Sequence, residues 1–204
     1  IIEIQESPMR IGVFGGSFNP IHKYHEQIGH HLVQHKYLDK IIYVPTGDKY
    51  HYKEISVDDE TRLKMINLVT NKYNYFEVDD YELQDKEIYT YQTLKYIKEN
   101  HPEDEIYFIC GTDNLTYVDK WQNGIDLLKQ YKFICIKRNT DGIDEILTRF
   151  NDYKHNIIVV DMQESNLSST YIRNHISDTN ICKYLDKDVY EFIITNNLYR
   201  KIKK

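Results

Sequence analysis

The sequence has no alanine, only 4 prolines and only 3 cysteines among its 204 residues. The cysteines, Cys110, Cys135 and Cys182, are scattered and form no Cys-x-x-Cys pair, so we expect neither a disulfide framework nor a zinc site. This usage of cysteine is typical of a reducing compartment, which we take to be the cytoplasm or the nucleus. The missing alanine and the 19 tyrosines indicate an AT-rich coding sequence and exclude no chemistry.

Two further absences restrict the partners. No apolar run reaches the roughly 18 residues that a membrane span needs, and residues 1–6 lack the basic region and apolar core of a secretory signal. The 26 lysines and arginines are outnumbered by 32 aspartates and glutamates, which gives a net charge of -6. No global basic field is therefore available to attract nucleic acid or a membrane surface, and an anionic ligand must be held by a local site.

The length and the pattern of the chain predict one domain. No repeat, low-complexity tract or linker divides it, so we expect an N-terminal extension over residues 1–8 and a single domain over 9–204. Short β-rich runs alternate with longer helical patterns, which is typical of βαβ units. The expected fold class is α/β, with an open, mostly parallel, Rossmann-like sheet and helices on both faces.

The expected elements follow this alternation. Strands are predicted over residues 10–14, 40–44, 75–78, 106–110, 133–136 and 157–160. Helices are predicted over residues 25–35, 58–70, 91–99, 125–129, 143–150, 170–176 and 188–195, with Ser56 and Thr90 as caps. Ligands of open α/β sheets bind beyond the carboxyl ends of the strands. The site should therefore be lined by residues 15–25, 45–53, 111–121 and the start of the helix at Ser168.

The most informative motif begins directly after the first apolar run. Gly15, Gly16 and Ser17 are small enough for a ligand to approach the backbone closely, and the helix that follows presents unpaired N–H groups. His22 and His25 lie three residues apart, so both imidazoles share one face of its first turn. A Gly-Gly-Ser turn or a lone histidine is common by itself, but this combination favours a phosphate site. The Gly-x-Gly-x-x-Gly fingerprint is absent, which argues against a dehydrogenase.

A second motif lies near the carboxyl end. Ser168 and Thr170 place hydroxyls at a helix start, and Arg173 follows three residues later, so these groups can converge on phosphate oxygens. The alternative is an ordinary helix cap beside a solvated arginine.

Together the two motifs resemble the nucleotidyltransferase superfamily that carries His-x-Gly-His and Ser-x-Thr-x-Ile-Arg signatures. The first is matched by Ser17, Phe18, Asn19, Pro20, His22 and His25, and the second by Ser168, Thr170, Ile172 and Arg173. Within it, the chain is similar to the bacterial-type nicotinate mononucleotide adenylyltransferases from Met9 to Tyr199. Further matching segments are Val44-Pro45, Tyr89–Leu94, Gly111–Leu115, Trp121, Lys137-Arg138, Tyr190–Ile193 and Asn197–Tyr199.

The resemblance implies roles for the acceptor side of the site. Trp121 would stack on the pyridine ring, and Thr90 with N–H groups beside Trp121 would hold the nicotinate carboxylate. Gly111 and Asp113 would contact a ribose, although core packing for Trp121 and a plain strand end at Gly111 remain alternatives. The resemblance also implies that His51 and Arg138 would contact the mononucleotide. The family loop Pro-Pro-His-Lys is replaced here by Lys49–Lys53, which leaves open whether Lys53 reaches phosphate and whether His51 is merely solvated.

The resemblance also implies the reaction. AMP would pass from ATP to nicotinate mononucleotide, giving deamido-NAD and pyrophosphate in NAD biosynthesis. No Ser/His/Asp ordering indicates a covalent nucleophile, so the attack would be direct and in line. His22 and His25 would stabilise phosphoryl charge, the Gly15-Gly16-Ser17-Phe18 turn would bind phosphate, and the helix from Ser168 to Arg173 would hold pyrophosphate. No Asp/Glu cluster suits a metal, so Mg²⁺ would be bound mainly through ATP.

Several alternatives stay open. Nicotinamide mononucleotide is a second acceptor, and a homodimer is left open. Phosphopantetheine adenylyltransferases and cytidylyltransferases share both motifs. A non-catalytic nucleotide sensor is suggested by Tyr24, which replaces the family glycine. A ring there must fill the nucleotide space or swing aside, and we expect it to flank the adenine or face solvent.

Overall fold

The computed structural model describes residues 7–49, 57–137, 142–163 and 165–200. Six parallel strands form one open sheet in the order β3-β2-β1-β4-β5-β6. The strands are β1 (Arg10–Gly16), β2 (Lys40–Pro45), β3 (Phe76–Val78), β4 (Glu105–Gly111), β5 (Lys132–Lys137) and β6 (Ile157–Asp161). This is the strand order of a dinucleotide-binding doubly wound sheet, so the predicted Rossmann-like α/β class is confirmed.

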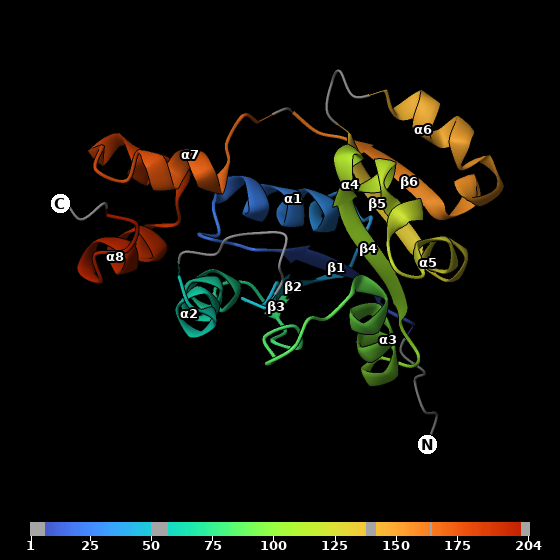
Figure 1. Ribbon diagram of the computed structural model, residues 1–204, viewed down its shortest axis with the longest axis horizontal. Coiled ribbons are helices and arrows are strands. Elements are labelled where there is room, and N and C mark those ends of the chain that lie inside the picture. The colour runs from blue at the N-terminus through green and yellow to red at the C-terminus, as the bar shows by residue number, and fades with distance from the viewer. Residues whose placement is uncertain (1–6, 50–56, 138–141, 164, 201–204) are drawn as a thin grey trace.

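Helices cover both faces of the sheet (Figure 1). They are α1 (Lys23–Gln34), α2 (Asp59–Thr70), α3 (Thr90–Asn100), α4 (Thr112–Thr116), α5 (Gly124–Gln130), α6 (Ile143–Arg149), α7 (Ser169–Asn174) and α8 (Lys187–Thr195), with 3₁₀ turns η1 (Val118–Lys120), η2 (Asn151–Asn156) and η3 (Thr179–Tyr184). None of the described helices is long and apolar enough to cross a bilayer.

Two hydrophobic cores lie on opposite faces of the sheet. Along β2, Ile41 and Tyr43 pack with α1, α2, α7 and α8, whereas Ile42 and Val44 pack with α3, α5 and α6. Successive residues of a strand point to opposite faces, so a strand covered on both sides is apolar throughout. This burial explains why the strands were readable as continuous apolar runs.

The predicted elements agree with the observed ones to within a few residues at each end, but one predicted cap is wrong. Tyr89, rather than Thr90, is the N-cap of α3, and its N–H donates to Gln92 Oε1 at 2.9 Å. Thr90 is the first helical residue because this capping box closes one position earlier. The predicted cap Ser56 lies outside the described residues. Asp58 caps α2 by accepting a hydrogen bond from the Thr61 N–H.

The chain reverses its winding between β1 and β4, which are adjacent at the centre of the sheet. The connection from β1 leads through α1 to β2 on one side, and β4 leads on to β5 on the other. A crevice opens beyond the carboxyl ends of two such strands, and there open α/β sheets bind ligands. Gly16 and Gly111 end these two strands.

Candidate active site

Two cavities adjoin at this crevice. The first has a volume of about 580 Å³ and the second about 610 Å³. Gly15, Gly16 and Asn114 line both cavities, so the two cavities meet over the end of β1. Within the described residues, each segment that was expected to line the site lines at least one cavity. The loop after β2 does so through Thr46.

The glycines at the strand ends leave room that the protein itself does not fill. A Cβ added at Gly111 would meet no atom within 4 Å, and one at Gly15 would meet only the Val44 carbonyl oxygen at 4.0 Å. Packing within the protein therefore does not require glycine at either position. The open space suits close approach of a ligand to the backbone, as the sequence predicted.

The two motif histidines lie together in the wall of the first cavity. Their rings are stacked with centroids 3.6 Å apart, and the His22 N–H donates to His25 Nδ1 at 3.1 Å. Because Nδ1 accepts this bond, a neutral His25 carries its proton on Nε2. Burial lowers the pKa of His22 to about 4, so this imidazole is neutral at pH 7. The pair can thus offer N–H donors to an anion without carrying two adjacent charges.

Aromatic residues fix the position of His25. Phe18 has a positive φ of 45° and is 2% exposed, and its ring meets the imidazole edge-on at a centroid distance of 4.9 Å. The Tyr43 hydroxyl donates to the His25 carbonyl oxygen at 2.9 Å. Phe18 therefore packs against the histidine from within the core, and its role in binding phosphate stays a prediction.

The carboxyl-terminal motif closes the first cavity. Arg173 Nη1 donates to the Asn19 carbonyl at 2.8 Å, and Nη2 donates to Thr170 Oγ1 at 3.1 Å. Ser168 Oγ accepts from the Tyr171 N–H and so caps α7, while Ser168, Thr170 and Arg173 also line the cavity. The cap interpretation thus holds for Ser168, and the phosphate role of the motif stays a prediction. The half-buried arginine ties α7 to the turn that precedes α1.

A buried arginine that the sequence did not reveal holds the turn after β1, at Ser17. Arg62 of α2 is 0% exposed, its Nη1 donates to the Ser17 carbonyl at 2.7 Å, and its Nη2 bonds Asp59. Asp59 in turn accepts from the N–H of Asp48, in the loop after β2. The sequence carried a signal of this burial, since Arg62 lies three residues before Met65 and shares the buried face of α2 with it.

Of the two expected positions of the Tyr24 ring, flanking the adenine or facing solvent, the structure contradicts the second. Tyr24 is 6% exposed, belongs to the core cluster with Ile28, and lines the first cavity beside His25. The cavity persists with this ring in its wall. Burial follows from helical spacing, because residue 24 lies one turn before Ile28 on the face that packs against the sheet.

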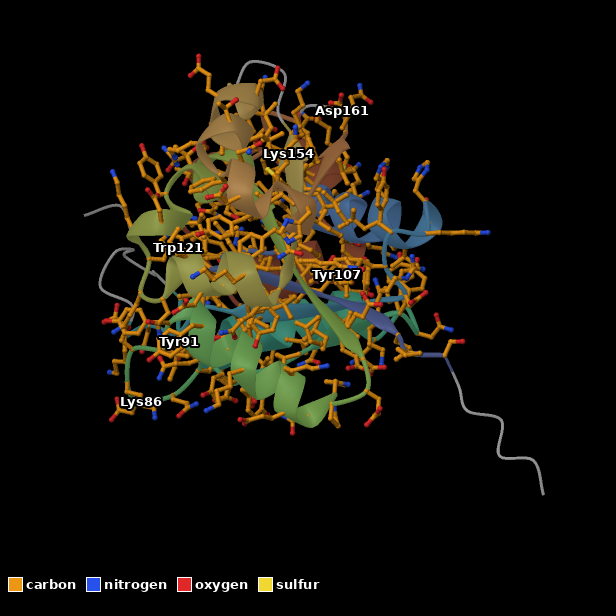
Figure 2. The ribbon with its side chains drawn as sticks, turned by 90° about the vertical axis from the view of Figure 1, so that its right-hand side faces the viewer. Lys86, Tyr91, Tyr107, Trp121, Lys154 and Asp161 are labelled. Carbon is orange, nitrogen blue, oxygen red and sulfur yellow. The ribbon has the colours of Figure 1, made fainter. Side chains whose placement is uncertain are left out.

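The second cavity contains the predicted acceptor residues. Thr90, at the start of α3, and Trp121 both line it, together with Tyr117 and Lys120. Figure 2 shows Trp121 toward the same side of the molecule as Tyr91 in the first turn of α3. Trp121 also packs edge-on against Phe108 at a centroid distance of 5.9 Å. Core packing and a cavity-lining position therefore coexist in this side chain.

The remaining predicted residues separate into two groups. Gly111 and Asp113 line the first cavity with the histidines, and not the second cavity with Trp121. His51, Lys53 and Arg138 lie outside the described residues. Across the ranges that the structure describes, no group of three or more His, Cys, Asp or Glu side chains comes together to hold a metal ion.

Comparison with known proteins gives consistent matches. The sequence model of the family described as cytidylyltransferase-like matches residues 13–175. A protein of Carboxydothermus hydrogenoformans named "probable nicotinate-nucleotide adenylyltransferase" is 36% identical, and the match covers 94% of this chain and 98% of that protein. A protein of the same name from Clostridium perfringens is 33% identical, again over 94% of this chain and 98% of its own length.

A solved structure supports the fold independently. The nicotinic acid mononucleotide adenylyltransferase of Plasmodium falciparum, complexed with NaAD, superposes with a TM-score of 0.78 at 24% sequence identity. The superposition covers 94% of this chain and 97% of that one.

Proposed function

This chain belongs to the nicotinate-nucleotide adenylyltransferases of the cytidylyltransferase-like family, and we propose that it transfers the AMP moiety of ATP to nicotinate mononucleotide. The products are deamido-NAD and pyrophosphate, as in NAD biosynthesis. Nicotinamide mononucleotide is a poorer acceptor in this proposal. The support comes from relatives that align over nearly their full length and from the arrangement of the two cavities.

The observation that carries the proposal is the junction of the two cavities over Gly15, Gly16 and Asn114. A transfer between two nucleotides needs two binding spaces that share one reacting centre. ATP occupies the first cavity, with its phosphates against the turn after β1 and its ribose toward Asp113. The acceptor occupies the second cavity, with its ring at Trp121 and its 5′-phosphate directed at the junction.

The chemistry is positioning and electrostatic stabilisation. The acceptor phosphate attacks the α-phosphorus in line, and the bond to the pyrophosphate oxygen breaks. His22 and His25 donate N–H groups to the phosphoryl oxygens that gain charge. Arg173 and the start of α7 hold the departing pyrophosphate.

The residues of this site suit a magnesium ion that is bound mainly through the phosphates of the nucleotide. Asp113 is the only acidic residue among those that line the first cavity in the described chain. One carboxylate cannot form a metal cage, so phosphate oxygens and water supply most of the ligands. When bound, Mg²⁺ neutralises charge on the leaving pyrophosphate.

A panel of acceptors tests the proposal. With ATP and Mg²⁺, pyrophosphate release is expected to be fastest with nicotinate mononucleotide, slower with nicotinamide mononucleotide and absent with phosphopantetheine or a cytidylyl-transfer pair. The reason is that the positive end of the helix dipole at the N-terminus of α3 favours a ring carboxylate. Release with phosphopantetheine alone would assign the chain to another substrate class. No release with any acceptor, despite ATP binding, would identify a sensor.

Trp121→Ala is expected to weaken binding of the mononucleotide and to leave binding of ATP unchanged. Loss of base stacking on an aromatic ring costs about 1–3 kcal/mol, which corresponds to a rise of about 5- to 150-fold in KM for the mononucleotide. The KM for ATP should stay within about twofold, because Trp121 lines only the second cavity. Trp121→Phe is the control that keeps the contact with Phe108. Equal weakening of both substrates would leave Trp121 with a purely structural role.

A further inference from the structure

A carboxylic acid lies in the wall of the second cavity, and no cationic side chain of the described residues pairs with it. Glu82, in the segment between β3 and α3, lines this cavity together with Thr90 and Trp121. Its Oε1 accepts a hydrogen bond of 2.6 Å from the hydroxyl of Thr93, a buried residue in the first turns of α3. Its Oε2 has no hydrogen-bond partner among the described residues. This second oxygen is therefore available to a ligand.

The backbone around Glu82 is closely packed, and the Thr93 hydroxyl holds its carboxyl group at one oxygen. A Cβ added at Gly47 would lie 2.4 Å from the Glu82 carbonyl oxygen, so the loop after β2 packs directly on this segment. On the other side, the Thr93 N–H donates to the Tyr89 carbonyl at 3.2 Å, which anchors Thr93 beneath the N-terminus of α3. The carboxyl group and the helix N-terminus thus belong to one rigid wall.

Burial controls the charge of Glu82. Desolvation raises its pKa to about 7, the Thr93 hydrogen bond opposes this rise, and no charged group of the described chain contributes. The titratable groups that line the same cavity are Tyr89, Tyr117 and Lys120. On the segments packed around it, Lys49 pairs with Asp48 and Asp85, and on α3 Lys95 pairs with Glu99. At neutral pH Glu82 is therefore divided between its neutral and ionised forms.

We propose that Glu82 is a specificity-determining residue, which binds nicotinate mononucleotide as the neutral acid by donating a hydrogen bond from Oε2 to the ring carboxylate. This inference rests on the proposed function and deepens it. An ionised Glu82 repels the ring carboxylate, whereas it accepts a hydrogen bond from the N–H of a carboxamide. The protonation state of one side chain thus sets the preference between the two pyridine acceptors.

The consequence is a preference that depends on pH. If only neutral Glu82 binds nicotinate mononucleotide, its KM rises about 30-fold between pH 6 and pH 8.5, given a pKa of about 7. The KM for nicotinamide mononucleotide does not share this rise. The 5′-phosphate of both acceptors ionises near pH 6, so its contribution cancels in the ratio of their kcat/KM values.

The test measures this ratio from pH 6 to pH 9 for the wild type and three variants. Glu82→Gln keeps an acceptor for Thr93 and donates at every pH, so its ratio should be constant. Thr93→Val removes the bond that lowers the pKa of Glu82, so the decline should move to higher pH. Glu99→Gln, at the exposed end of α3, is the control and should follow the wild type.

A ratio that does not change with pH in the active wild type would overturn the inference and leave the proposed function intact. Retention of the wild-type pH dependence by folded Glu82→Gln would overturn it as well. If Glu82→Gln does not fold, the Thr93→Val variant decides. A pH dependence of the kcat/KM ratio that is the same in Thr93→Val as in the wild type would overturn the inference. Lack of turnover with both pyridine mononucleotides would refute the proposed function, and this inference with it.

Discussion

Replacement of His25 by alanine is expected to lower kcat by about 10²- to 10³-fold, with a modest change in KM for either substrate. His25 accepts the His22 N–H at Nδ1, so a neutral ring carries its proton on Nε2, and the residue lines the first cavity. Loss of a donor aimed at charge that develops only in the transition state reduces turnover and leaves ground-state binding largely unchanged. Steady-state kinetics with both substrates measure this separation.

His22→Ala should lower kcat to a similar extent. It also removes a buried side chain at the N-cap of α1, so thermal unfolding must accompany the kinetics. His35→Ala, at the exposed end of the same helix, is the matched control and should retain full turnover. Near wild-type turnover in a folded variant of either cavity histidine would show that the assigned role is wrong.

Replacement of Arg173 by alanine is the second large effect, with an expected loss of about 10²- to 10³-fold in kcat and a matching loss of inhibition by pyrophosphate. The guanidinium already bonds Asn19 and Thr170, which orients its other N–H groups at the cavity. Arg173→Lys should restore little, because an ammonium cannot make both bonds and still present a planar fork to phosphate. Product inhibition by pyrophosphate is the decisive measurement.

The fold should survive this change. The turn before α1 keeps two other ties, since Ser169 Oγ donates to the Pro20 carbonyl at 2.8 Å and the Tyr199 hydroxyl donates to Asn19 Oδ1 at 2.6 Å. Arg10→Ala, at the opposite end of β1 and paired with Asp39, is the control and should leave the kinetics unchanged. If pyrophosphate inhibits the Arg173→Ala protein normally, Arg173 has only the structural role of holding α7 in place.

The buried Tyr24 changes how the sensor alternative is tested. Its ring is part of the core, so Tyr24→Gly removes packing and places glycine inside a helix, which costs about 1 kcal/mol relative to alanine before packing is counted. The acceptor panel with the wild-type protein therefore distinguishes enzyme from sensor more directly than this substitution.

Features encoded in contiguous residues were readable from the sequence. The alternation of β-rich and helical runs predicted all six strands, because a strand covered on both faces must be apolar throughout. The Gly15-Gly16 turn and the His22 and His25 pair were readable for the same reason, since the spacing that gives them a common face is local. Trp121 was assigned to the pyridine by resemblance to a family. It lines the second cavity, and its stacking role stays a prediction.

Contacts between distant segments and the states of buried groups were decided by the tertiary structure. Arg173 meets Asn19 across 154 residues, and Arg62 meets Ser17 across 45, which no local spacing specifies. The neutrality of His22 and the raised pKa of Glu82 both arise from desolvation, which exists only once the chain has folded around them. The sequence by itself determined the α/β fold class and the family to which the chain belongs. The fold decided which groups share a cavity and which of them are charged there, because proximity and dielectric environment are properties of the packed chain.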